Sequence, residues 1–136
     1  RFGPMSHARL GIAEDNSGKL VTLVRDHAVY LAKENHLTKN LIDGSPGTGC
    51  PVIASLTAAN YAVIVTEPTV SGLHDMKRIF ELINHFRIKA GVVINKFDIN
   101  KDMTEKIKEE ASKVEIKILG FIPYDEIVTT AQMKTL

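Results

Sequence analysis

An acidic residue followed by a glycine-rich loop is the first candidate for chemistry in this chain. The stretch LIDGSPGTGC, residues 41–50, holds Asp43 and, four positions later, Gly47. A carboxylate there can act through the water shell of Mg²⁺, and a glycine leaves a backbone N–H bare beside a phosphate. The D-x-x-x-G pattern also suits an ordinary turn with a capping aspartate, so these residues alone favour neither interpretation.

A second pattern, N-K-x-D, occupies residues 95–98. In guanine-nucleotide proteins the aspartate of this pattern accepts two N–H bonds from guanine, while the asparagine and lysine frame the ring. A GTPase also carries D-x-x-G, and here the spacing is D-x-x-x-G. Asn95 could instead bind adenine through its amide, so the base stays open. The interpretation without a ligand is an Asx turn in which Asp98 caps the next helix.

Two further loops carry candidate residues. Pro123 and Asp125 could form one wall of a base pocket, or simply a strand end before a capped helix. Ser71 and Asp75 lie at a strand-to-helix transition and suit capping as well as ligand binding.

Cys50 is the single cysteine, which excludes an internal disulfide framework and is compatible with a reducing cytoplasm. At a helix N-terminus its thiolate would be favoured and could ligate a metal or cluster. The alternative is a small buried cysteine, which is more common. The five histidines are scattered without metal-ligand spacing, and no Ser-His-Asp or Cys-His arrangement is indicated.

Composition excludes several function classes. A net charge of +1 gives no global field for nucleic acid or an anionic membrane. No apolar run reaches the ~18 residues of a membrane span. A cytoplasmic location is expected, in keeping with the single cysteine. The length of 136 residues predicts one domain. The chain begins at Arg1 and its first methionine is Met5, so we expect a fragment or a processed chain.

The elements that must position these residues follow from periodicity and turn signals. Strands are predicted at residues 40–43, 61–66, 90–94 and 115–119. Helices are predicted from 15 or 17 to about 35, from 51 to 58, from about 73 to 86, from 101 to 113, and after 125. The β-branched run at 61–66 is typical of a strand covered on both faces.

The Gly18-Lys19 pair resembles the end of a phosphate loop. However, Gly11 lies too far upstream to be the first glycine of that loop, and Leu20 stands where the loop has a Ser or Thr that holds Mg²⁺. A helix start with a solvated lysine is predicted there.

Strands alternating with helices predict an α/β fold: a parallel sheet of about four strands flanked by helices. In this topology the loops after Asp43, Thr66, Asn95 and Ile122 lie along one edge of the sheet. Ligands of open α/β sheets bind outside the carboxyl ends of the strands. Four loop signals on one edge therefore favour nucleotide binding over ordinary turns.

Five longer stretches resemble the C-terminal portion of MinD/ParA-type P-loop ATPases, specifically the branch with an inserted ferredoxin domain. They are RFGPMSHARLGIAEDNSGKLVTLVR, LIDGSPGTGCPVIAS, VTEPTVSGLHDMKR, VVINKFDIN and LGFIPYDEIV, and they cover almost the whole chain in the expected order. The resemblance implies an incomplete P-loop NTPase-like, deviant Walker fold. It also implies kinship with the nitrogenase iron protein and with cobyrinic acid a,c-diamide synthase-like proteins.

The resemblance assigns roles to individual residues. Asp43 matches the acidic residue that acts on Mg²⁺ through water, and Gly47 matches the switch glycine near the γ-phosphate. Asn95 matches the adenine-contacting asparagine, and Pro123 with Asp125 matches the loop around the base. The resemblance therefore implies ATP despite the N-K-x-D string.

Three other residues match positions linked to assembly. Ser71 and Asp75 match positions near the nucleotide-sandwiched interface of MinD-like dimers, which implies a homodimer. Cys50 follows Asp43 at a spacing similar to that of a cluster-ligating cysteine in the nitrogenase iron protein, although a second cysteine is absent. A 4Fe-4S cluster in the intact protein and an iron-sulfur or redox partner are the corresponding expectations.

The glycine-rich Walker A loop and the Cys-rich ferredoxin insert of this branch would both lie upstream of Arg1. We therefore expect residues 1–136 to be the C-terminal part of a nucleotide-binding domain, an ATPase in the intact protein but inactive alone. Two alternatives remain: a non-catalytic dimerisation or partner-docking module, and a GTP-binding protein that uses N-K-x-D.

Overall fold

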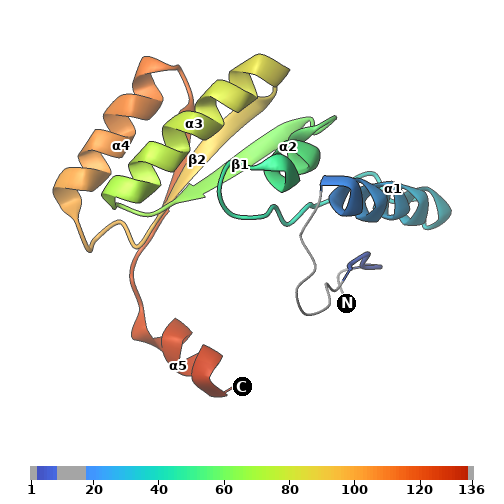
Figure 1. Cartoon of the computed structure of the whole chain (residues 1–136). Helices are drawn as coiled ribbons and strands as arrows, with labels where there is room; N and C mark the ends of the chain where they lie inside the picture. The colour runs from blue at the N-terminus through green and yellow to red at the C-terminus, as the bar shows by residue number, and fades with distance from the viewer. Residues whose placement is uncertain (1–2, 9–17, 135–136) are drawn as a thin grey trace. The chain divides into compact units, whose positions relative to one another are not determined.

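The computed structural model describes residues 3–8 and 18–134, which form two compact units, 1–59 and 60–136. The first unit contains α1 (Gly18–Glu34) and α2 (Cys50–Leu56). The second contains β1 (Tyr61–Thr66), α3 (Val70–Phe86), β2 (Lys89–Asn95), α4 (Lys101–Lys113), β3 (Lys117–Ile122) and α5 (Glu126–Lys134) (Figure 1). The predicted alternation of helices and strands is confirmed in the second unit.

In the first unit α1 packs against α2. Arg25 Nη1 donates a 2.6 Å hydrogen bond to the Ala54 carbonyl oxygen, and Val52 is buried. A Cβ at Gly18 would lie 3.2 Å from the Cys50 carbonyl oxygen, so a small residue suits this close approach. Lys19 is exposed in the first turn of α1, as predicted for a helix start. Gly11 and the predicted helix start at 15 or 17 lie outside the described residues.

The predicted strand at residues 40–43 is wrong. These residues have no regular secondary structure, and the Leu41 side chain is fully exposed. A strand is stabilised by ladder hydrogen bonds to a neighbour, which a short apolar run cannot supply by itself. The sheet described here therefore has three strands, where about four were expected.

The sheet of the second unit is parallel throughout, in the order β1-β2-β3. The predicted bounds of β1 and α4 are confirmed, whereas β3 starts and ends later than predicted and runs through Gly120. Glycine normally weakens a strand interior, so the sequence suggested an earlier end. A Cβ at Gly91 on β2 would lie 2.5 Å from Leu119 Cγ, so the Leu119 side chain on β3 lies where a side chain at position 91 would be.

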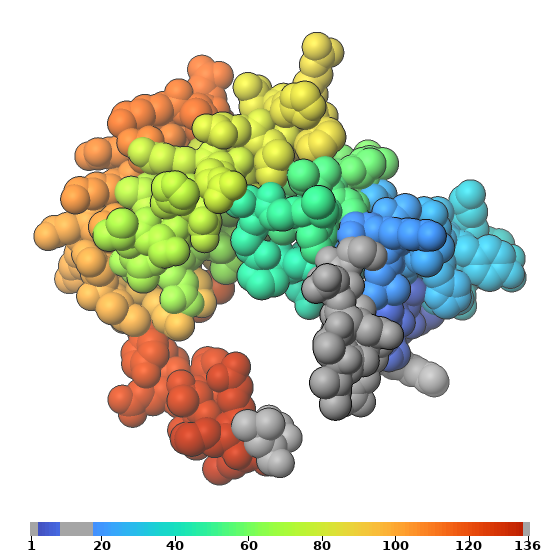
Figure 2. Space-filling view, in the orientation of Figure 1, coloured from blue at the N-terminus to red at the C-terminus, as the bar shows by residue number. Residues whose placement is uncertain are grey.

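The core of the second unit lies between the sheet and the pair α3 and α4. Met76 and Phe80 on α3, Ile107 on α4, and Val92 and Ile94 on β2 are buried together in this layer. In Figure 1 the two helices run side by side over the sheet, and in Figure 2 their side chains form one continuous layer.

The opposite face of β1 is exposed within the described residues. Residues of β1 alternate, so that Tyr61, Val63 and Val65 are 49%, 56% and 63% exposed. The prediction that this strand is covered on both faces is therefore not met by the described part of the chain. None of the described helices is long and apolar enough to cross a membrane.

Candidate functional site

The loops that follow β1, β2 and β3 share one edge of the sheet, because the strands are parallel neighbours. They carry Glu67 after β1, residues 95–98 at the end of β2, and residues 123–125 after β3. The predicted convergence is confirmed for these three loops. It is not confirmed for the loop after Asp43, because no strand precedes it.

Glu67 connects the first two of these loops. Its Oε1 atom lies 2.8 Å from Lys96 Nζ and accepts a hydrogen bond of 3.4 Å from Asn95 Nδ2. Lys96 has a φ of +54°, a left-handed conformation that is uncommon outside glycine, asparagine and aspartate. The asparagine and the lysine of N-K-x-D thus both face one carboxylate of the neighbouring loop.

Asp98 connects the second and third loops. Its Oδ1 atom accepts a 2.7 Å hydrogen bond from the Tyr124 backbone N–H. The Phe97 N–H donates to the Ile122 carbonyl oxygen at 3.2 Å, and the Phe97 and Phe121 rings meet edge to face with centroids 5.5 Å apart. The Asp98 carboxylate thus holds the loop after β3 against the end of β2.

The helix that follows is capped by a different residue from the one proposed. Asn100 Oδ1 accepts the 3.0 Å hydrogen bond from the Met103 N–H at the start of α4. The interpretation of Asp98 as that cap is therefore wrong. An asparagine one residue before a helix is a normal N-cap, so the signal was present in the sequence.

Pro123 and Asp125 are exposed beside Asp98, on the same edge. Asp125 Oδ1 accepts a 2.9 Å hydrogen bond from the Ile127 N–H at the start of α5. This contact agrees with the capped-helix interpretation of the segment. Among the described residues, no hydrogen bond or ion pair involves the second carboxylate oxygen of Asp125.

The start of α3 is held by two threonines that were not among the predicted site residues. Thr69 Oγ1 accepts a 2.9 Å hydrogen bond from the Gly72 N–H, and Thr66 Oγ1 donates to the Gly72 carbonyl oxygen at 3.1 Å. Ser71 is exposed, and Asp75 Oδ1 lies 3.6 Å from His74 Nδ1. Ser71 and Asp75 therefore do not supply the cap, and both lie near the surface at the start of α3.

Asp43, Gly47 and Cys50 belong to the first unit. Asp43 is exposed, and Gly47 has a φ of +86°, which favours glycine. Cys50 is exposed at the first residue of α2, so the buried-cysteine interpretation is wrong. The prediction that Pro51 lies in the first helical turn is confirmed.

In the described residues no group of three or more His, Cys, Asp or Glu side chains could hold a metal ion.

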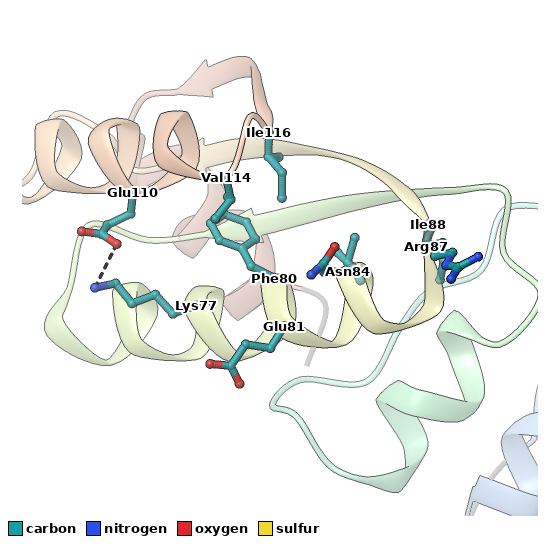
Figure 3. A pocket seen from close by; sticks show the side chains of 10 residues that line it. Lys77, Phe80, Glu81, Asn84, Arg87, Ile88, Glu110, Val114 and Ile116 are labelled. Atoms are coloured by element: carbon teal, nitrogen blue, oxygen red, sulfur yellow. Dashed lines mark ion pairs between the residues drawn. The ribbon is translucent and has the colours of Figure 1, made fainter.

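A groove of about 560 Å³ lies between α3 and the segment that joins α4 to β3 (Figure 3). Phe80, Val114 and Ile116 line it, and the 3.0 Å ion pair of Lys77 with Glu110 crosses one end. The hydrogen bond from Lys113 lowers the pKa of Glu110 most, and the hydrogen bond from Lys77 lowers it further. None of the predicted site residues lines this groove.

Comparison with known proteins places these observations in a family. Residues 3–136 match the family described as the CobQ/CobB/MinD/ParA nucleotide binding domain. The chain is 33% identical over 97 residues to the uncharacterized protein MJ0578 of Methanocaldococcus jannaschii, covering 71% of this chain and 34% of that protein. It is 37% identical over 82 residues to the uncharacterized ATP-binding protein MJ0823 of the same organism, covering 57% and 30%.

A solved structure shows the same fold. The chain is similar to the MinD cell division protein of Aquifex aeolicus with a TM-score of 0.60 and 18% identity, covering 83% of this chain and 49% of that one. The matched region spans about a third of the length of the Methanocaldococcus relatives. The match over residues 3–136 shows that the chain belongs to the CobQ/CobB/MinD/ParA nucleotide-binding domain family.

Proposed function

We propose that this chain is the C-terminal part of an ATP-binding MinD/ParA-type ATPase and supplies the base-binding half of its site. The observation that carries the proposal is the meeting of Asn95, Asp98 and the Pro123–Asp125 loop at the carboxyl edge of a parallel sheet. Ligands of such sheets bind at this edge. The similarity to a relative named as ATP-binding supports ATP as the nucleotide.

Asp43 and Gly47 of the first unit are proposed to act on Mg²⁺ and phosphate. Mg²⁺ usually keeps several waters and is bound by one or two carboxylates together with substrate phosphates. The exposed carboxylate of Asp43 fits this mode and would hold Mg²⁺, whose charge would neutralise that of the phosphates. A Cβ at Gly47 would meet nothing within 4 Å, and a backbone N–H in such an open loop is proposed to donate to a phosphate oxygen.

An iron-sulfur cluster does not fit the residues of this chain. A cluster of this class is held by four thiolates, and the sequence contains Cys50 alone. Even two copies would supply half of the ligands. We therefore derive no step through a cluster.

Hydrolysis is proposed for the longer protein and not for this chain. The matched relatives are about three times as long as the region they share with it. A phosphate loop with its lysine normally cradles the β- and γ-phosphates, and this sequence has no such loop. Ser71 and Asp75, near the surface at the start of α3, are proposed to face a second copy in a homodimer.

A second candidate is a non-catalytic dimerisation or docking module. The exposed apolar residues Tyr61, Val63 and Val65 on one face of β1 favour it, because contiguous apolar surface is often an interaction site. This candidate predicts self-association or partner binding without any nucleotide effect.

Calorimetric titration of the chain with Mg-ATP separates the two candidates. The proposal predicts weak binding, with a Kd of about 1 mM, because the phosphate cradle is missing. Asn95→Ala should weaken Mg-ATP binding about three- to tenfold, because one hydrogen bond to the base is lost. Glu105→Ala, an exposed change on α4, should leave it unaltered. Binding that Asn95→Ala does not affect would contradict the proposal.

A further inference from the structure

The contacts of Glu67 determine which way the Asn95 amide faces. One oxygen of Glu67 accepts from Asn95 Nδ2 at 3.4 Å and lies 2.8 Å from Lys96 Nζ. A carboxylate paired with an ammonium group is ionised and can only accept hydrogen bonds. The amide NH₂ group therefore has to face Glu67, because the opposite orientation would set two acceptor oxygens against each other.

This orientation leaves Asn95 Oδ1 on the other side of the amide. Among the described residues, none donates a hydrogen bond to this atom. Asn95 is half-buried at the end of β2, so water only partly surrounds it. The side chain thus offers the neighbouring space an acceptor and not a donor.

We propose that Glu67 is a specificity-determining positioning residue, which fixes the Asn95 carbonyl oxygen as the group that reads the nucleotide base. This inference rests on the proposed function and adds the basis of its base selectivity. Adenine carries an exocyclic amino donor where guanine carries a carbonyl acceptor. An acceptor at Asn95 matches adenine and repels the guanine oxygen.

Lys96 supports this arrangement from within the same motif. Its left-handed backbone conformation and its ion pair place the ammonium group against Glu67. The turn is held on its other side by the 2.8 Å hydrogen bond from Thr104 Oγ1 to the Phe97 carbonyl oxygen. In this chain the lysine of N-K-x-D thus holds the carboxylate that orients the asparagine.

The test compares ATP with GTP in competition binding to the full 136-residue chain. Glu67→Gln allows the Asn95 amide to turn, and Glu67→Met removes the acceptor altogether. The preference for ATP over GTP should fall about threefold in Glu67→Gln and about tenfold in Glu67→Met, the effect of one hydrogen bond. Glu105→Gln removes an exposed carboxylate that also pairs with a lysine at 2.9 Å, and it should leave the preference unchanged.

A second readout requires no nucleotide. The side-chain amide signals of Asn95 in the ¹⁵N–¹H spectrum of the free chain should shift in both Glu67 variants and stay in place in Glu105→Gln. Unmoved signals, or an ATP preference unchanged in both Glu67 variants, would overturn the inference while leaving nucleotide binding intact. If the wild-type chain binds neither nucleotide, the proposed function fails and the inference falls with it.

Discussion

Asp98 has a structural task that its sequence motif does not reveal. Its carboxylate accepts from the Tyr124 N–H at 2.7 Å and so ties the loop after β2 to the loop after β3. A hydrogen bond to a charged acceptor contributes more than a neutral one, although exposure to water reduces the gain. The residue therefore shapes the edge where the base is proposed to bind.

Replacing Asp98 should loosen this edge without unfolding the chain. We expect Asp98→Ala to lower the free energy of unfolding by about 1 kcal/mol and to speed hydrogen exchange at the Tyr124 amide. Asp98→Asn keeps an acceptor oxygen and should lose less. Urea denaturation and amide exchange measure the two effects. Exchange at Tyr124 that is equal in all three proteins would show that the hydrogen bond is absent in solution.

Residue types at these positions were predictable, but their partners were not. Asn95 and Asp98 follow a buried β-branched strand in a recognisable string, so the sequence identified both. Glu67 was missed because its contact with Asn95 joins residues 28 positions apart, which depends on strand pairing. The capping role of Asn100 was available from local sequence alone.

At the scale of elements, α3 and α4 are joined by charges at the surface of their shared layer. Lys77 on α3 lies 3.0 Å from Glu110 on α4, and Glu110 also accepts from Lys113. These contacts lower the pKa of Glu110, and the hydrogen bond with Glu110 raises the pKa of Lys113.

The Glu110 contacts should produce a pH dependence with a definite sign. Since folding lowers the pKa of Glu110, its stabilising contribution is present above the unfolded-state pKa and disappears as the pH falls through the folded-state value. Carboxyl NMR titration should show that Lys113→Met raises the pKa of Glu110 more than Lys77→Met does. Lys108→Met, which removes a different ion pair on α4, should not raise it. Equal effects of all three variants would contradict this ranking.

The turn from β1 into α3 requires a glycine at position 72. A Cβ there would collide with the Glu67 carbonyl oxygen and approach the side chains of Thr66 and Thr69. Because the carbonyl oxygen is backbone, it cannot move without shifting Glu67 itself.

Gly72→Ala should therefore be costly. Forcing an extra carbon into such a site costs about 1–3 kcal/mol, measurable by thermal or urea unfolding. Gly120→Ala is the matched control, since a Cβ at Gly120 meets nothing within 4 Å. If both variants are equally stable, the close approach at Gly72 does not exist.

The elements that were predicted well share one property. β1 is a β-branched run, and α4 follows the N-cap Asn100 with apolar residues at helical spacing, so the local sequence indicated their bounds. Residues 40–43 have the composition of a strand but no ladder partner in the described structure. Strand composition alone does not create a strand, because its hydrogen bonds come from elsewhere in the chain.

At the scale of the whole molecule, candidate residues lie in both units. The loops with Asn95 and Asp98 belong to the second unit, and Asp43 belongs to the first. The chain matches about a third of the length of its relatives, so the rest of the site is proposed to come from outside it.

We expect this chain to hydrolyse ATP no faster than its Asp43→Ala variant does. A phosphate-release assay measures both rates. Turnover that Asp43→Ala abolishes would show that the chain is catalytically sufficient.

A map of backbone amide shift changes on titration with Mg-ATP tests directly whether the base binds at this edge. We expect the largest changes in the second unit at the carboxyl edge of the sheet, around Glu67, Asn95, Asp98 and Tyr124. The groove beside Phe80 and Val114 should stay unchanged. Changes concentrated in that groove, or no changes at millimolar nucleotide, would contradict a base-binding role for this edge.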